Sequence, residues 1–150
     1  MEMTNKAIYF DLDGTLADLY AVDGWLPMLR AYDPTPYAEA EVLVNMNSLA
    51  KILHRLQREG WHIGIVSWLS KTSTAEYDEA VIEAKKRWLS RHLRSVQFDE
   101  MRFLPYGMPK QENVDFPYGV LFDDENGNRE AWTGEAFDVN QILETLKSLL

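Results

Sequence analysis

The chain has 150 residues, a formal net charge of -9, an apolar fraction of 46% and no cysteine. This length suffices for one domain with a hydrophobic core, and the apolar fraction excludes a largely disordered chain. The acidic balance argues against nucleic acid as a partner, and the lack of cysteine excludes disulfides and thiolate metal sites. No apolar run reaches the roughly 18 residues of a membrane span, and no signal-peptide pattern precedes the first apolar run, so we expect a cytoplasmic protein without a membrane segment.

Hydrophobic periodicity predicts the elements of the first half in chain order. A fully apolar run at residues 7–10 predicts a buried strand, and the segment 23–45, rich in proline and aromatic residues, is predicted to be irregular. Apolar residues at helical spacing predict a helix over 46–56, which Gly60 ends. The run 62–66 predicts a second strand.

In the second half of the chain, predicted strands and helices continue to alternate. Apolar residues from Tyr77 to Trp88 mark one face of a long helix, and strands are predicted at 101–104, 118–122 and 135–137. A C-terminal helix follows, beginning at Asp138, which is spaced from Gln141 as in a capping box. Strands that are apolar throughout and alternate with helices predict one α/β domain over 1–150, with a Rossmann-like parallel sheet flanked by helices.

Ligands of such sheets bind at the carboxyl ends of the strands, so the residues that follow each strand are candidates for the site. They are Asp11 and Asp13 after the first strand, Ser67 and Trp68 after the second, and Asp123 and Asp124 after the fourth. Lys110 lies in a Gly/Pro-rich loop before the fourth strand. Ser70 and Lys71 are placed to line the mouth of a pocket there, whereas Trp25 is expected to belong to a local core.

These residue types suit phosphoryl chemistry with a hard metal ion. Oxygen ligands without cysteine favour Mg²⁺, held by Asp11, the backbone near Asp13, and Asp123 or Asp124. Asp11 could then attack phosphorus, while Asp13 protonates the leaving oxygen. Ser67 and Lys110 would hold the phosphoryl oxygens. Lys85 and Lys86, in the middle of the predicted long helix, are the alternatives to Lys110.

The four segments "YFDLDGTLAD", "IGIVS", "MPKQEN" and "VLFDDENGN" resemble, in order, the motifs of the haloacid dehalogenase (HAD) superfamily. The resemblance implies Asp11 as an aspartyl nucleophile, Asp13 as acid/base, and a Mg²⁺ site completed by Asp123 and Asp124. It also implies substrate contacts from Gly14, Thr15, Ser67, Trp68 and Lys110. The second Asp of the first motif is typical of the phosphatases and phosphomutases of the superfamily. The short flap or cap insertion, 17–45, resembles near-capless phosphatases and favours a phosphatase over a mutase.

The resulting hypothesis is a Mg²⁺-dependent phosphomonoester hydrolase that acts through an aspartyl-phosphate on a small phosphate ester. The compact size resembles nucleotidase-type members, which makes a nucleotide one candidate substrate. The partner is then a small phosphorylated molecule, and a homo-oligomer is left open. The alternatives are a phospho-acceptor signalling module and a catalytically inactive, ligand-binding relative. A receiver-type module would place its acidic pair first and its lysine last, which is not the order found here.

Overall fold

The computed structural model describes residues 6–150, so the extreme N-terminus, on which the signal-peptide prediction depends, lies outside it. Its main sheet has five parallel strands: β1 (Ala7–Phe10), β4 (His62–Trp68), β5 (Glu100–Leu104), β6 (Val120–Phe122) and β7 (Ala136–Phe137). Their spatial order is β5-β4-β1-β6-β7. The predicted Rossmann-like parallel sheet is confirmed, with the first strand in its centre.

One face of the sheet packs against helices α3 (Met46–Arg58) and α6 (Ile142–Leu149). The spacing of Leu49, Leu53 and Leu56 places all three on one side of α3, where they are fully buried. Asn45 caps this helix by accepting a hydrogen bond from the Ser48 backbone N–H. Gly60, at a φ of 93°, follows the helix and lets the chain reverse into β4.

The opposite face is covered mainly by non-helical chain. Tyr9, Val66 and Leu121 point to this side and pack with Trp132, which follows the short helix α5 (Asn126–Ala131). Side chains from the loop between β5 and β6 complete the layer, which includes the turn at Lys110–Glu112. Lys110 is therefore buried against the sheet, although the rest of its loop is at least partly exposed.

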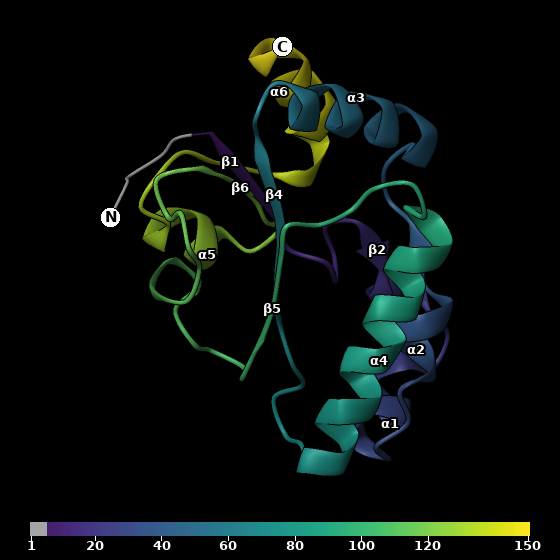
Figure 1. Ribbon diagram of the computed structural model, residues 1–150. Coiled ribbons are helices and arrows are strands. Elements are labelled where there is room, and N and C mark those ends of the chain that lie inside the picture. The colour runs from purple at the N-terminus through teal and green to yellow at the C-terminus, as the bar shows by residue number, and fades with distance from the viewer. Residues whose placement is uncertain (1–5) are drawn as a thin grey trace.

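The insertion after β1 lies beside the long helix α4 (Ala75–His92), away from the main sheet (Figure 1). It contains a two-stranded antiparallel ribbon, β2 (Ala17–Asp18) with β3 (Glu41–Val42), and two short helices, α1 (Trp25–Arg30) and α2 (Thr35–Glu39). The prediction of irregular chain over 23–45 was therefore wrong. Sequence periodicity did not reveal five- and six-residue helices, which are too short to show a repeated apolar face.

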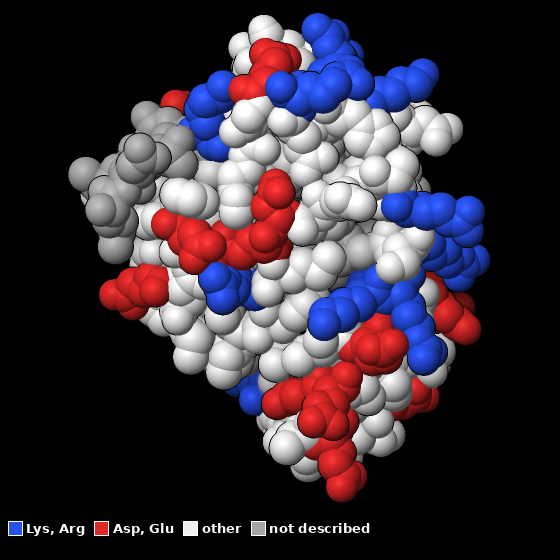
Figure 2. All heavy atoms as spheres, in the orientation of Figure 1, with Lys and Arg blue, Asp and Glu red and all other residues white. Residues whose placement is uncertain are grey.

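Helix α4 carries opposite charges at its two ends. Thr74 caps it, Glu76 and Asp78 lie in its first turn, and Arg91 and His92 lie in its last turn. Figure 2 shows acidic side chains gathered over the lower end of α4 and basic side chains toward its upper end. This arrangement complements the helix dipole and stabilises the helix against which the insertion packs.

The other predicted elements are confirmed with shifted bounds. Strand β4 continues to Trp68, so Ser67 and Trp68 belong to the strand rather than following it, and β6 begins only at Val120. The capping box of Asp138 and Gln141 is present, but it begins a 3-10 turn that leads into α6. In the described part of the chain, no helix is long and apolar enough to cross a membrane.

Candidate active site

Three neighbouring strands bring the predicted residues to one edge of the sheet. Asp11 follows β1, Ser67 lies near the end of β4, and Asp123 follows β6. The Asp11 backbone N–H donates to the Phe122 carbonyl at 2.9 Å, which extends the pairing of β1 with β6 to the first carboxylate of the site. The convergence expected at the carboxyl ends of parallel strands is thus present.

Lys110 links the residue that follows β1 to the residue that follows β6. Its ammonium lies 2.9 Å from Asp11 Oδ1 and 2.7 Å from Asp123 Oδ2. Burial alone would lower the pKa of this lysine, but the charges of Asp11 and Asp123 outweigh it and raise the pKa above the ordinary value. Lys110 is therefore a fixed cation between two carboxylates.

Thr15 and Gly14 fix the position of Asp124, the other acidic residue that follows β6. The Thr15 hydroxyl lies 2.9 Å from Asp11 Oδ2 and 3.2 Å from Asp124 Oδ1, and it accepts a hydrogen bond from the Asp124 backbone N–H. Gly14 has a φ of 84°, and a side chain there would collide with the Asp124 carboxylate and with Tyr20. Only glycine fits this turn.

The two carboxylates that follow β6 differ in their surroundings. Asp123 is fully buried and accepts hydrogen bonds on both oxygens, from Glu125 N–H on one and from Lys110 and Asn128 on the other. Asp124 instead lines the pocket at the sheet edge. Asp124 is thus the better placed of the two to meet a ligand, and Asp123 holds Lys110.

The three carboxylates Asp11, Asp123 and Asp124 form a cluster that suits a divalent cation. Each offers an oxygen, and these oxygens lie within 4.8 Å of one another. Burial, followed by the charge of Asp11, raises the pKa of Asp123 to about 6 and that of Asp124 to about 8. Ionising all three carboxylates is therefore costly even with Lys110 beside two of them, and an oxygen-only ligand set fits Mg²⁺ as a further cation.

A second lysine enters the site from α4. The fully buried ammonium of Lys85 lies 2.9 Å from Asp13 Oδ2 and donates to Ser67 Oγ at 2.8 Å and to the Trp68 carbonyl at 2.7 Å. Burial raises the pKa of Asp13, and the charge of Lys85 opposes that rise. Lys86, by contrast, is exposed on the far side of the helix.

A pocket opens over these groups, with a cavity volume of about 290 Å³. Of the predicted site residues, the structure places Asp11, Asp13, Trp68, Lys110 and Asp124 on its wall, together with Ser70 and Lys71. The other predicted residues lie behind the wall and contact its members: Gly14, Thr15, Ser67 and Asp123. Thr15 and Ser67 are completely or almost completely buried, so they position other groups in this structure.

Sequence reasoning missed several aromatic residues and the asparagine that line the pocket. Trp25 was expected to be local core, but it is partly exposed and lines the pocket with Tyr20, Tyr37 and Tyr106. Asn128 both lines the pocket and binds Asp123. Lys85 was named only as an alternative to Lys110, although it carried a usable signal: it lies four residues after the buried Val81 and four before the buried Leu89. A lysine on the buried face of a helix requires an acidic or polar partner.

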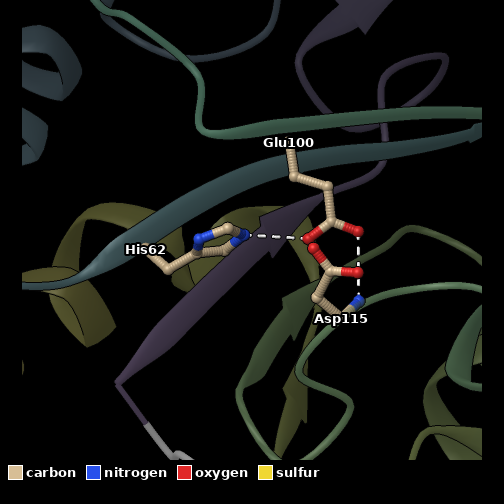
Figure 3. Close-up of side chains that lie close together, drawn as sticks. All are labelled: His62, Glu100 and Asp115. Atoms are coloured by element: carbon tan, nitrogen blue, oxygen red, sulfur yellow. Dashed lines mark hydrogen bonds and ion pairs between the residues drawn. The ribbon is translucent and has the colours of Figure 1, made fainter.

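A second cluster, His62, Glu100 and Asp115, has the composition of a metal site but lies at the start of β4 and β5 (Figure 3). Glu100 already accepts hydrogen bonds from His62, from the Tyr9 hydroxyl and from the Asp115 backbone N–H. Arg102 pairs with both Glu100 and Asp115 at 2.9 Å. Because both acids of the cluster already pair with this guanidinium, we assign the cluster a structural role.

No family model matches the sequence, and no curated protein matches it. Solved structures do match the fold. A D,D-heptose 1,7-bisphosphate phosphatase from B. bronchiseptica, complexed with magnesium and phosphate, aligns over 96% of this chain and 99% of its own, with a TM-score of 0.56 and 12% identity. The enzyme of the same description from Burkholderia thailandensis aligns over 83% and 70%, with a TM-score of 0.51 and 15% identity. At these identities the similarity establishes a shared fold.

Proposed function

We propose that the chain is a Mg²⁺-dependent phosphomonoester hydrolase of the HAD superfamily that acts through an aspartyl-phosphate. The observation that carries the proposal is the position of Asp11. It directly follows the central strand and lies on the pocket wall, with Lys110 on one oxygen and Thr15 on the other, and Asp13 and Asp124 line the same pocket. The likeness of the fold to phosphatases, one of them complexed with magnesium and phosphate, supports this reading.

The proposed reaction has two balanced steps. A carboxylate oxygen of Asp11 forms a bond to phosphorus as the ester P–O bond breaks, and the leaving oxygen takes a proton from Asp13. A water molecule then attacks the phosphorus of the aspartyl-phosphate and gives its proton back to Asp13, which releases phosphate and restores Asp11. Lys110 neutralises charge beside the nucleophile, and Lys85 holds Asp13 and Ser67 in place.

Mg²⁺ would be held by Asp11 and Asp124, with the backbone near Asp13, and with Asp123 behind them. Bound there, it would supply positive charge that offsets the carboxylate repulsion and the charge of the phosphoryl group. Such a cation explains how a protein of net charge -9 could bind an anionic ester.

The topology argues against the phospho-acceptor alternative. Numbered in chain order, the five strands of the main sheet lie in the order 3-2-1-4-5, with the candidate nucleophile after the first. Receiver-type domains have the order 2-1-3-4-5. The inactive-relative alternative gains no support from the site, because Asp11, Asp13 and Lys110 all remain on the pocket wall.

A bisphosphate substrate, as named for the two structural neighbours, fits this pocket less well. Lys110 already pairs with two carboxylates, and Lys71 at the rim is the one further lysine among the lining residues that the structure describes. A second phosphate group would have little positive charge to bind. We therefore propose a monophosphate ester.

The test is phosphate release from a panel of phosphomonoesters, with Mg²⁺ and with a chelator, by the natural chain and by Asp11→Asn. We expect release that requires Mg²⁺ and disappears in the variant, and acid-quenched protein that carries phosphate only when Asp11 is present. Equal inactivity of both proteins on every ester would overturn the proposal. Release that survives in Asp11→Asn would overturn the assignment of the nucleophile.

A further inference from the structure

The pocket next to Asp11 is walled by aromatic side chains from two different parts of the fold. Tyr20 and Trp25, from the insertion, meet edge to face with ring centroids 5.1 Å apart. Trp68 and Tyr106, from the ends of β4 and β5, form a second pair with centroids 5.1 Å apart. All four line the same cavity as the nucleophile.

Core packing does not explain three of the four rings, whereas Trp68 packs partly against the core. Tyr20 is 49% exposed and Tyr106 is 52% exposed. Trp25 belongs to helix α1, whose sequence WLPMLR is almost entirely apolar and yet buries no residue. Leu26 and Leu29 of the same helix also line the pocket. An apolar helix left open beside a catalytic pocket indicates a surface that a ligand covers.

The second aromatic pair is fixed next to the reaction centre. The Trp68 indole N–H donates to the Met108 carbonyl at 2.7 Å, which holds the plane of the ring. The Lys110 ammonium, which pairs with Asp11, lies 5.4 Å from the centroid of this ring. Tyr106 lies beyond Trp68, so the aromatic surface begins beside the nucleophile and extends outward.

The charged groups that can hold phosphate and metal lie together around Asp11. Asp11, Asp13, Lys110 and Asp124 supply the phosphoryl and metal positions, whereas the walls that the insertion supplies consist of leucine and aromatic side chains. A sugar phosphate without a ring system would leave these aromatic faces uncovered. A flat ring system can bury its faces against the aromatic pairs and needs few polar partners.

We infer that the substrate is a monophosphate ester carrying a planar heteroaromatic group, as in a nucleoside 5′-monophosphate, with the base held by Tyr20, Trp25, Trp68 and Tyr106. This inference rests on the proposed phosphatase function. The phosphate lies beside Asp11, the sugar passes Trp68, and the base lies between the two aromatic pairs.

The experiment compares adenosine and uridine 5′-monophosphates with ribose 5-phosphate, which has the same phosphorylated sugar and no base. With Mg²⁺ present, kcat/KM is expected to be at least tenfold higher for the nucleotides. Tyr106→Ala should raise KM for the nucleotides about tenfold, with a much smaller effect on ribose 5-phosphate, whereas Tyr106→Phe keeps the ring and should retain the preference. Tyr118→Ala removes a tyrosine that is similarly exposed but lines a different hollow, and it should change neither substrate.

The outcomes separate this inference from the proposed function. Hydrolysis of ribose 5-phosphate as efficient as that of the nucleotides, or an equal effect of Tyr106→Ala on both, would overturn the aromatic subsite and leave the phosphatase standing. Absence of turnover on every substrate would overturn the proposed phosphatase function. Calorimetry would then measure the binding of adenosine monophosphate to Asp11→Asn. Weaker binding after the further change Tyr106→Ala would support the aromatic subsite, and unchanged binding would overturn the subsite.

Discussion

Lys85 and Asp13 form an ion pair of 2.9 Å between a helix and a loop, and the lysine end of this pair is completely buried. The same ammonium also holds Ser67 and the Trp68 carbonyl. One residue of α4 therefore fixes the proposed acid/base and the end of β4 together. Lys110 performs the corresponding task for Asp11 and Asp123. The site contains two buried lysines with separate partners.

Replacing Lys85 with methionine should impair the proton transfer assigned to Asp13. Burial raises the pKa of Asp13 and Lys85 opposes this rise, so the variant should shift the kinetic pKa assigned to Asp13 to higher pH. We expect kcat to fall about a hundredfold at neutral pH. The measurement is the pH dependence of kcat and kcat/KM. Lys86→Met, which removes the exposed neighbouring charge, should leave the profile unchanged.

A buried carboxylate without its partner can also unfold the protein, so the folded state needs its own control. Asp13→Asn combined with Lys85→Met removes both charges, and it should be more stable than Lys85→Met alone in urea denaturation. A Lys85→Met protein that is folded by circular dichroism and keeps the natural pH profile would contradict the role assigned to Lys85.

Replacing Lys110 with methionine should abolish most of the activity. The two carboxylates that share its ammonium would face each other without a cation, and the charge beside the nucleophile would be lost. We expect kcat to fall about 10²- to 10³-fold. Lys147→Met, on the exposed side of α6, is the matched control and should keep full activity. Comparable rates for both variants would show that Lys110 is not part of the catalytic centre.

Metal binding should become more stabilising as pH rises. The pKa values of Asp123 and Asp124 are raised to about 6 and about 8 in the folded, metal-free protein, so the fold binds their protons more tightly than the unfolded chain does. Their contribution is fully present below pH 4 and is lost as pH rises through these values. Mg²⁺ binds the ionised carboxylates and should reverse this loss.

Thermal melts from pH 5 to pH 8.5, with Mg²⁺ and with a chelator, measure this effect. At a concentration a hundredfold above its Kd, the ion should add about 2.7 kcal/mol to the free energy of unfolding. Asp124→Asn should diminish the response to Mg²⁺ and should make the metal-free protein less sensitive to pH above 6. A Mg²⁺ effect of the same size at pH 5 and pH 8.5 would argue against the acidic cluster as the metal site.

Strand alternation and the order of the polar segments were enough to predict the sheet and the convergence of Asp11, Asp13, Lys110 and Asp124 on one edge. Fully apolar strands can lie only inside a covered sheet, and the edge at which parallel strands end is fixed by topology. The sequence favoured Lys110 over Lys85 and Lys86, whereas the structure brings both Lys110 and Lys85 against carboxylates of the candidate site. One lysine comes from a loop and the other from the buried face of α4.

The insertion was the least predictable part. Helices α1 and α2 span six and five residues, too few for a periodic signal. Their position depends on long-range packing of α2 against α4 and on the hydrogen bond from the Tyr77 hydroxyl to the Asp33 carbonyl. Trp25 therefore resembled a core residue in the sequence. Only the fold shows that its helix is open to the pocket.

Glu100 should matter for stability and not for catalysis. Burial tends to raise its pKa, but hydrogen bonds from Arg102, Tyr9, His62 and the Asp115 backbone N–H outweigh that tendency and lower it. A carboxylate with a lowered pKa contributes stability that is present above its unfolded pKa of about 4.5 and is lost as pH falls through the folded value. Glu100→Gln keeps the shape of the side chain but removes the charge on which these donors converge.

We expect Glu100→Gln to lower the free energy of unfolding at pH 7 by about 1–3 kcal/mol, because charge-assisted hydrogen bonds are replaced by weaker ones. The difference from the natural protein should shrink as pH falls below 4.5, because the carboxylate is protonated first in the unfolded chain and, at lower pH, in the folded protein. Urea denaturation at pH 7 and at pH 3.5 measures both quantities. Since the cluster lies at the opposite end of the strands from Asp11, kcat at pH 7 should be unchanged in folded protein. If the variant instead lost activity and added Zn²⁺ or Mn²⁺ restored it, the cluster would be a metal site. That result would contradict the structural role inferred from the pairing of Arg102 with Glu100 and Asp115.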